Sequence, residues 1–325
     1  MTLVVESFAS HLLEKNPLGD PNVRRIPVIL PPGYDPKVRY PVAYILGGYV
    51  SKGVTPLNEA AWEENLPQRV ERLVATGRVR PLIVVSPDGW TRYGGAQFLD
   101  SPGNGPYASS IARELVAWID AKYPTRADPA HRAILGHSSG GFGAIRMAMD
   151  FPGVFGHCAF HAGDALFETC YEPFFPRAVE GYRAFGGLDG YLAGFPQPLP
   201  RPDGWFDAVS MIANALAYSP NPEARHGFDL PFDPATGAVR AEVWERWLAH
   251  DPVRRVGARA AALRALSSLW LDCGTRDEWN LHLGARALST ELRANGVAHE
   301  YSEFDDGHRG TSYRYDHSLA RIFPA

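Results

Sequence analysis

The residues best suited to chemistry lie at positions 136–140, where the sequence is Gly-His-Ser-Ser-Gly. This is the G-x-S-x-G pattern, in which a serine occupies a sharp turn between a strand and a helix. The apolar run Ala133–Leu135 before it indicates a strand, and the Gly-rich stretch 140–149 after it indicates a helix. Glycines in such a turn let strand and helix approach closely while the serine takes a strained backbone conformation. The pattern predicts that Ser138 is an exposed nucleophile, the alternative being a helix cap.

A serine hydroxyl is a weak nucleophile at neutral pH, so it needs a base to take its proton and a carboxylate to orient that base. One known chain order for such a triad is serine, acid, histidine. Asp277 follows the apolar run Leu269–Cys273 by four residues, and His308 follows a second run that ends at Phe304. If the strands are parallel, both residues lie in loops at the edge where the serine turn opens. Asp277 and His308 are therefore the predicted acid and base.

Other roles for these residues stay open. Asp272 lies inside its strand, and Asp305 and Asp306 adjoin the histidine, so they suit helper roles better than the orienting one. Glu278 is a further carboxylate nearby. The alternative for His308 is a loop histidine that caps a helix starting near residue 312. For Asp277 the alternatives are an ion pair with its neighbour at position 276 or a helix N-cap.

Attack on a carbonyl also requires an oxyanion hole, commonly one N–H from the residue after the nucleophile and one from a loop after an early strand. Ser139 supplies the first. The second is expected from the backbone N–H of Tyr49, with Gly48 as the runner-up, because Gly47 and Gly48 let the backbone approach a substrate closely. The alternative is that this glycine pair only makes a tight strand exit.

Apolar runs alternate with amphipathic helical patterns on both sides of residues 164–250, which is typical of a mostly parallel sheet. Two helical stripes are predicted, within Ser110–Tyr123 and within Leu281–Leu292, the latter ending at Asn295-Gly296. The fold class predicted is α/β, with helices on both faces of the central sheet. The predicted strands are Val28–Leu30, Pro41–Leu46, Leu82–Ser86, Ala133–Gly136, Phe155–Phe160, Leu269–Cys273 and Ala298–Phe304.

Residues 164–250 interrupt this alternation. They are dense in Pro, Gly and aromatic residues, with weak helical periods near 206–216 and 239–248. The segment is too long for a loop and too apolar to stay solvated, so we interpret it as a cap inserted into a core made of residues 1–163 and 251–325. The cap is either an aromatic-lined lid over the site or a structural elaboration, such as an interface in a homo-oligomer.

Composition narrows the range of functions. The 325 residues carry a net charge of −4 with both signs mixed along the chain, which disfavours a nucleic-acid partner. Three cysteines without a C-x-x-C pair argue against a disulfide framework and a thiolate metal site, and His157 and His161 are better read as core or pocket-edge residues. No stretch is apolar enough for a membrane span or signal peptide. We therefore predict a cytoplasmic protein without a metal or other cofactor.

Several segments together resemble the esterase family of α/β-hydrolases that includes S-formylglutathione hydrolases, enterochelin esterases, feruloyl esterases and mycolyltransferases. The resemblance covers most of the chain outside 164–250. It implies an α/β-hydrolase fold, with nucleophile, acid and histidine at Ser138, Asp277 and His308 and the second oxyanion donor at Tyr49. Many α/β-hydrolases have His-Gly where this chain has Gly47-Gly48. The segments are NPLGDPNVRRIPVILPPGYD, YPVAYILGGY, VVSPDGW, GHSSGGFGA, DCGTRDEW and DDGH.

The function predicted from the sequence is a serine carboxylesterase that acts on small-molecule esters through an acyl-enzyme. An acyltransferase would use the same triad and pass the acyl group to an alcohol in place of water. A non-catalytic binding protein on this fold is the remaining alternative.

Overall fold

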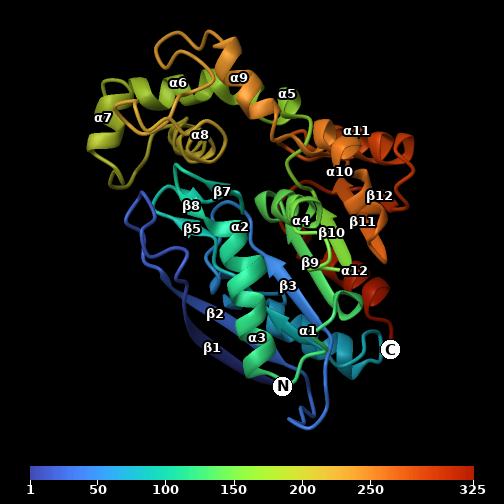
Figure 1. Ribbon diagram of the computed structural model, residues 1–325. Helices are drawn as coiled ribbons and strands as arrows, with labels where there is room; N and C mark the ends of the chain where they lie inside the picture. Colours follow the sequence, from blue (N-terminus) through green and yellow to red (C-terminus); the bar gives the residue numbers. More distant parts are fainter.

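An eight-stranded sheet forms the centre of the computed structural model, which describes residues 1–325 (Figure 1). The strand order is β1-β2-β4-β3-β9-β10-β11-β12. The six strands from β4 to β12 in this order run parallel, whereas β1 and β2 are antiparallel to their neighbours. The prediction of a mostly parallel α/β sheet is confirmed. The strands are β1 (Thr2–Ala9), β2 (Val23–Leu30), β3 (Val42–Leu46), β4 (Ile83–Val85), β9 (Arg132–His137), β10 (His157–His161), β11 (Ser268–Gly274) and β12 (Glu300–Phe304).

Helices cover both faces of the sheet, as strands buried on both sides require. Successive residues of β3 point to opposite faces, with Tyr44 in one hydrophobic cluster and Ala43 and Ile45 in the other. The smaller cluster lies beneath α1 and α12, and the larger one beneath α3, α4, α10 and α11. These helices are α1 (Leu66–Ala75), α3 (Val116–Lys122), α4 (Ser139–Asp150), α10 (Pro252–Arg264), α11 (Leu281–Ala294) and α12 (Tyr315–Ile322).

The helix predicted over Ser110–Tyr123 is longer and less regular than expected. It begins as α2 (Tyr107–Ser109), continues through a π-helical segment at Ser110–Leu115 and ends as α3. The predicted helix within Leu281–Leu292 is confirmed as α11, and Gly296 follows it at φ 64° in the left-handed conformation expected of a helix cap.

The inserted segment folds into five helices gathered at one end of the molecule (Figure 1). The weak periods near 206–216 and 239–248 correspond to α8 and α9. The aromatic residues Phe175, Tyr182 and Trp247 belong to the same hydrophobic cluster as the sheet, so the segment packs onto the core. Its division from the core as a separate unit stays a prediction. The helices are α5 (Phe167–Cys170), α6 (Phe175–Arg183), α7 (Leu188–Ala193), α8 (Trp205–Tyr218) and α9 (Ala241–Leu248).

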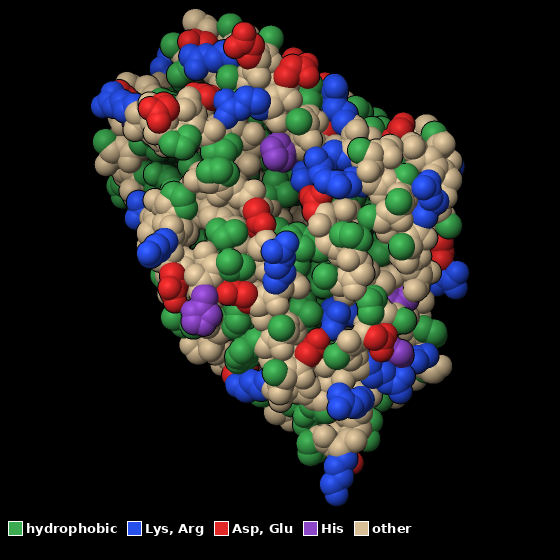
Figure 2. All heavy atoms as spheres, in the orientation of Figure 1, with side chains coloured by type: hydrophobic (Ala, Val, Ile, Leu, Met, Phe, Trp, Pro, Cys, Tyr) green, Lys and Arg blue, Asp and Glu red, His purple; other side chains and the backbone are tan.

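Acidic and basic side chains are interspersed over the face drawn in Figure 2, in keeping with the small net charge. None of the helices combines the length and the apolar character needed to cross a bilayer.

Candidate active site

The parallel strands bring the predicted site residues to one edge of the sheet. Ser138 directly follows β9, Asp277 follows β11 by three residues, and His308 follows β12 by four. The loop that contains Tyr49 follows β3, the neighbour of β9. Because the carboxyl ends of parallel strands meet at the same edge, loops far apart in the chain converge there. The expected placement of these loops is confirmed.

Ser138 occupies a strained turn between β9 and α4. Its backbone has φ 60° and ψ −129°, a conformation that non-glycine residues rarely adopt. Its N–H donates to the carbonyl of His161 at 3.0 Å, and its own carbonyl accepts from the N–H of Phe142 at 3.0 Å. A Cβ atom on Gly140 would lie 2.2 Å from the carbonyl oxygen of Leu46, so no side chain fits there. These contacts have the geometry of a nucleophile turn.

His308 and Asp277 form a buried hydrogen-bonded pair. His308 Nδ1 lies 2.7 Å from Asp277 Oδ2, and the two side chains are 9% and 0% exposed. The other carboxylate oxygen, Oδ1, accepts the N–H of Trp279 at 2.9 Å. Burial opposes ionisation of Asp277, but the hydrogen bond and charge of His308 outweigh it, so the pKa of Asp277 is lowered. An ionised Asp277 holds the proton of His308 on Nδ1 and leaves Nε2 free to accept another.

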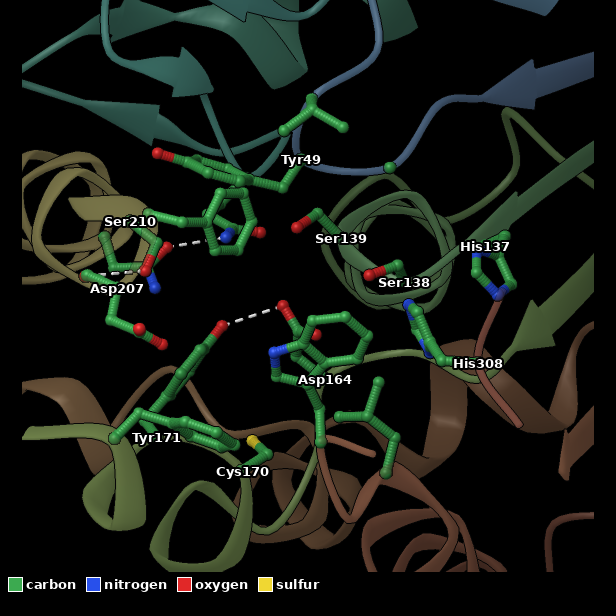
Figure 3. Close-up of a pocket in the computed structure, with 18 of the residues that line it drawn as sticks. Tyr49, His137, Ser138, Ser139, Asp164, Cys170, Tyr171, Asp207, Ser210 and His308 are labelled. Atoms are coloured by element: carbon green, nitrogen blue, oxygen red, sulfur yellow. Dashed lines mark hydrogen bonds between the residues drawn. The ribbon is translucent and has the colours of Figure 1, made fainter. Parts of the chain in front are cut away.

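Ser138 and His308 line the same cavity, and their side chains lie beside each other in Figure 3. The Ser138 hydroxyl points into the cavity and makes no hydrogen bond to His308 in this structure (Figure 3). Such bonds are often long or poorly aligned in free enzymes and tighten when substrate binds. The structure therefore brings the three predicted residues together, with the Asp277–His308 contact formed.

Two further residues support His308. Its backbone N–H donates to Glu278 Oε2 at 2.7 Å, so this carboxylate holds the loop and does not orient the ring. The His137 ring packs against the His308 ring with centroids 4.4 Å apart. Burial, with the nearby charge of His308, lowers the pKa of His137 to about 3, so His137 is neutral at physiological pH. The G-x-S-x-G pattern does not specify the residue at position 137, so it did not predict the contact between His137 and His308.

The expected oxyanion donors lie next to the serine. Ser139 is the first residue of α4, so its N–H has no carbonyl one turn earlier to bind. A Cβ atom on Gly48 would lie 3.5 Å from Ser138 Cβ, which places the Gly48–Tyr49 backbone beside the nucleophile. The N–H of Tyr49 donates no hydrogen bond within the chain. The hydroxyl of Tyr49 donates to the carbonyl of Tyr93 at 2.6 Å, which anchors the loop.

A second Ser-His-Asp set lies in the core. His161 places Nδ1 2.7 Å from Asp272 Oδ1 and Nε2 2.9 Å from Ser318 Oγ, and each of the three residues is at most 2% exposed. The other oxygen of Asp272 accepts from Arg314 Nε at 3.0 Å. No substrate can reach this set, so it is structural. The interpretation of His161 as a core residue and the rejection of Asp272 as the orienting acid are consistent with these contacts.

The cavity at the site has a volume of about 500 Å³. As the hypothesis of an aromatic cap anticipates, the inserted segment contributes the rings of Tyr171, Phe174 and Phe206 to its wall. The same segment also contributes polar side chains from α8, which the hypothesis did not anticipate. These are Asp207, Ser210 and Asn214.

Asp164 also belongs to the site, although the sequence patterns indicated only that the insertion starts there. It follows β10 by three residues at the same sheet edge and lines the cavity with Ser138. Its Oδ2 accepts the Tyr171 hydroxyl at 2.7 Å, and the residue is 7% exposed. Burial raises its pKa from 3.8 to about 6 against the opposing effects of Tyr171 and His308.

We expect Asp164→Asn to gain stability relative to wild type as the pH rises from 4 to 8. Above pH 6 the wild-type carboxyl is ionised in both the folded and the unfolded protein, and burial of this charge destabilises the folded state. Below pH 3.8 the carboxyl is protonated in both states, so the destabilisation vanishes. The raised pKa of Asp164 corresponds to a change in the free energy of unfolding of about 3 kcal/mol at most. Urea unfolding of both proteins at pH 4, 6 and 8 measures it. A difference in unfolding free energy that is constant across these pH values contradicts the raised pKa.

A strained serine followed by an acid and a histidine, at the carboxyl edge of a mostly parallel sheet, defines the α/β-hydrolase class. A family model described as "Putative esterase" matches residues 21–325. The chain belongs to this esterase family.

Individual relatives are more distant. An esterase of Mycobacterium tuberculosis is 35% identical over 91 residues, which are 26% of this chain and 19% of that protein. The chain thus spans about a fifth of the length of the curated relatives that it matches first.

Similar solved structures extend over nearly the whole chain. A ferulic acid esterase has a TM-score of 0.61 at 20% identity and covers 99% of this chain and 98% of its own. An S-formylglutathione hydrolase from Agrobacterium tumefaciens has a TM-score of 0.56 at 17% identity, covering 98% of this chain and 91% of its own. At these identities the likeness shows a shared fold.

Proposed function

We propose that this protein is a serine carboxylesterase that cleaves small-molecule carboxylic esters through an acyl-enzyme on Ser138. The observation that carries the proposal is that the strained serine turn opens into the same cavity as His308, whose ring is paired with Asp277 behind it. A nucleophile, a base and an orienting acid are the groups that this chemistry requires. The family assignment supports it, as do the names of the similar structures, a ferulic acid esterase and an S-formylglutathione hydrolase.

In the proposed reaction, Ser138 Oγ attacks the ester carbonyl while His308 Nε2 takes the hydroxyl proton. Asp277 stabilises the imidazolium that forms, and the N–H groups of Tyr49 and Ser139 bind the oxyanion. Collapse of the intermediate breaks the C–O bond, and His308 returns the proton to the leaving alcohol. Water then attacks the acyl-enzyme, with His308 again as the base, and releases the acid and free Ser138.

The orientation of α4 favours this charge distribution. Its N-terminus points its unpaired N–H groups and partial positive charge toward Ser138, where negative charge develops in the transition state. The rings of Phe174, Phe206 and Trp279 provide apolar walls for the rest of the ester. The cytoplasmic location is likewise proposed, supported by three cysteines that are all unpaired.

Rapid-mixing kinetics with p-nitrophenyl butyrate test the acyl-enzyme. We expect a burst of p-nitrophenol approaching one equivalent of enzyme, followed by slower steady turnover, provided that deacylation limits the rate. Quenching with acid, followed by intact-protein mass spectrometry, should detect a butyryl adduct whenever deacylation is slow enough for the acyl-enzyme to accumulate. Equal kcat values for several butyrate esters show that deacylation limits the rate, and turnover without either signal then contradicts a covalent mechanism.

Product analysis in the same assay separates the two fates of the acyl group. Hydrolysis predicts butyric acid as the product even when glycerol or another alcohol is added at high concentration. A shift of most of the product to the butyrate ester of the added alcohol would assign the protein to the acyltransferases, which use the same residues.

A further inference from the structure

One end of the active-site cavity is lined by polar side chains that the ester chemistry does not use. Asp207, Ser210 and Asn214 are spaced i, i+3 and i+7 on α8, so they share one face of a helix that is otherwise almost wholly apolar. Asp207 and Ser210 lie across the cavity from Ser138, and Asp164 approaches from the end of β10 (Figure 3). Polar groups on the buried face of a helix are costly, so their placement here requires a reason.

The hydrogen bonds within this group leave acceptor oxygens unused. Tyr218 and Tyr171 have their hydroxyls 3.1 Å apart, and Tyr171 donates onward to Asp164 Oδ2, so that oxygen is occupied. The Ser139 side chain also interacts with the Asp164 carboxyl and favours its ionised form. Asp207 Oδ2 accepts from Arg177 Nε at 3.0 Å, whereas its Oδ1 accepts no hydrogen bond within the chain.

An amide pair lies buried behind the same end of the cavity. Gln97 Nε2 donates to Asn214 Oδ1 at 2.6 Å, while Gln97 Oε1 is buried without any partner. Gln97 is 2% exposed, and an unsatisfied buried oxygen of this kind costs roughly 1–3 kcal/mol. The Asn214 Nδ2 group donates no hydrogen bond within the chain. The charged groups of this wall are the carboxylates of Asp164 and Asp207, which favour a hydrogen-bond donor as the partner.

The backbone that carries Gln97 is itself strained. Gln97 and Phe98 have φ values of 55° and 50°, two consecutive non-glycine residues in the left-handed region. Backbone strain of this kind persists only where the surrounding structure holds the residue in place, and it is concentrated at binding and active sites. Three features at this end of the cavity therefore lower the stability of the folded protein. They are the strained backbone at Gln97 and Phe98, the unpaired Gln97 Oε1, and the buried Asp164 carboxyl, whose pKa is raised.

We propose that Asp164, Asp207 and Asn214, with Gln97 behind them, form a polar subsite that binds a hydrogen-bond-donating group, a hydroxyl or an ammonium, on the substrate. This proposal rests on the proposed function and narrows it to esters whose acyl or alcohol part carries such a group. The donor pairs with the carboxylate oxygens, and we expect an ester that lacks it to react more slowly because these oxygens are then left without a partner. The aromatic rings contact the apolar part of the same ester.

Two matched ester series test the subsite. The acyl series compares methyl hexanoate and octanoate with their 6- and 8-hydroxy and 6- and 8-amino derivatives, and the alcohol series compares propyl butyrate with glyceryl monobutyrate. We expect kcat/KM for at least one polar ester to exceed that of its apolar partner by about tenfold to a hundredfold, as for a hydrogen bond to a charged group. The hydroxy and amino arms distinguish the two donors.

Variants assign the preference to this end of the cavity. Asp164→Asn and Asp207→Asn should each reduce the ratio of kcat/KM values, polar over apolar ester, by about tenfold. Asp189→Asn is the matched control, because Asp189 lies in the same inserted segment but is exposed and paired with Arg225. The ratio is independent of the fraction of folded enzyme, which thermal melting checks separately.

Two results overturn the subsite. Equal kcat/KM values for the polar and the apolar ester of every pair would do so. Variants that lower kcat/KM for both esters alike, and so leave the ratio unchanged, would do so as well. If instead no ester of either series is hydrolysed by wild type, the proposed function itself fails, and the two failures are thereby distinguished.

Discussion

Replacing Ser138 with alanine is expected to lower kcat for p-nitrophenyl butyrate by about a million-fold, the scale seen when the nucleophile of such a triad is removed. The substitution deletes the only hydroxyl at the strained turn that faces His308, and without it no acyl-enzyme can form. Little else changes, because the Ser138 side chain does not cap α4 and no hydrogen bond joins it to the other residues drawn in Figure 3. Steady-state assays at high enzyme concentration measure the residual rate.

Ser318→Ala is the matched control for this substitution. Ser318 also contacts a histidine that is paired with an aspartate, but that set is sealed in the core. We expect the control to keep kcat within a few-fold of wild type while losing some stability through the lost hydrogen bond. Parity between Ser138→Ala and wild type would remove the proposed mechanism.

The second large effect is expected at Asp277. Asp277→Asn should lower kcat by about ten-thousand-fold, because the amide no longer stabilises the imidazolium and can hold His308 in the wrong tautomer. The buried 2.7 Å contact between the two side chains is the basis for this value. Measuring kcat and KM separately should show the loss in kcat, since Asp277 is not among the residues that line the cavity.

Asp305→Asn provides the comparison for Asp277. Asp305 lies three residues before His308 in the chain, but its side chain is 84% exposed and pairs with Arg276 at the surface. This variant should retain nearly wild-type kcat. If Asp277→Asn retains activity within tenfold of wild type, another group orients His308 and the assignment of the acid is wrong.

Much of the framework could be predicted from the sequence because it depends on local patterns. Buried strands of a parallel sheet are continuous apolar runs, and the runs near residues 42–46 and 269–273 were recognised on that basis. The strand β1 was missed although Leu3, Val4 and Val5 form an apolar run. It lies at the sheet edge with Leu3 and Val5 exposed, and its pairing with the distant β2 is not apparent from its own sequence. The π-helical segment at Ser110–Leu115 has no local signature in the sequence.

The residues of the candidate site likewise fall into those that local patterns predicted and those that they did not. Ser138, Asp277 and His308 follow strands, so chain order and strand direction were enough to bring them together. The contact of His137 with His308 depends on packing between distant segments, which no local pattern encodes. Asp164 contacts the nearby Tyr171, but its place in the same cavity as Ser138 likewise depends on the tertiary fold. One signal was available: three polar residues on a single face of the apolar helix 205–218, at Asp207, Ser210 and Asn214, indicate a wall that faces something polar.

Covalent labelling with a fluorophosphonate, followed by peptide mapping, tests the central claim most directly. The reagent reacts with a serine only where a base activates the hydroxyl and donors stabilise the resulting oxyanion. The account predicts one adduct per chain, on the peptide that contains Ser138, absent in Ser138→Ala and retained in Ser318→Ala. A folded wild-type protein that stays unlabelled, or that carries the adduct on another serine, would contradict it.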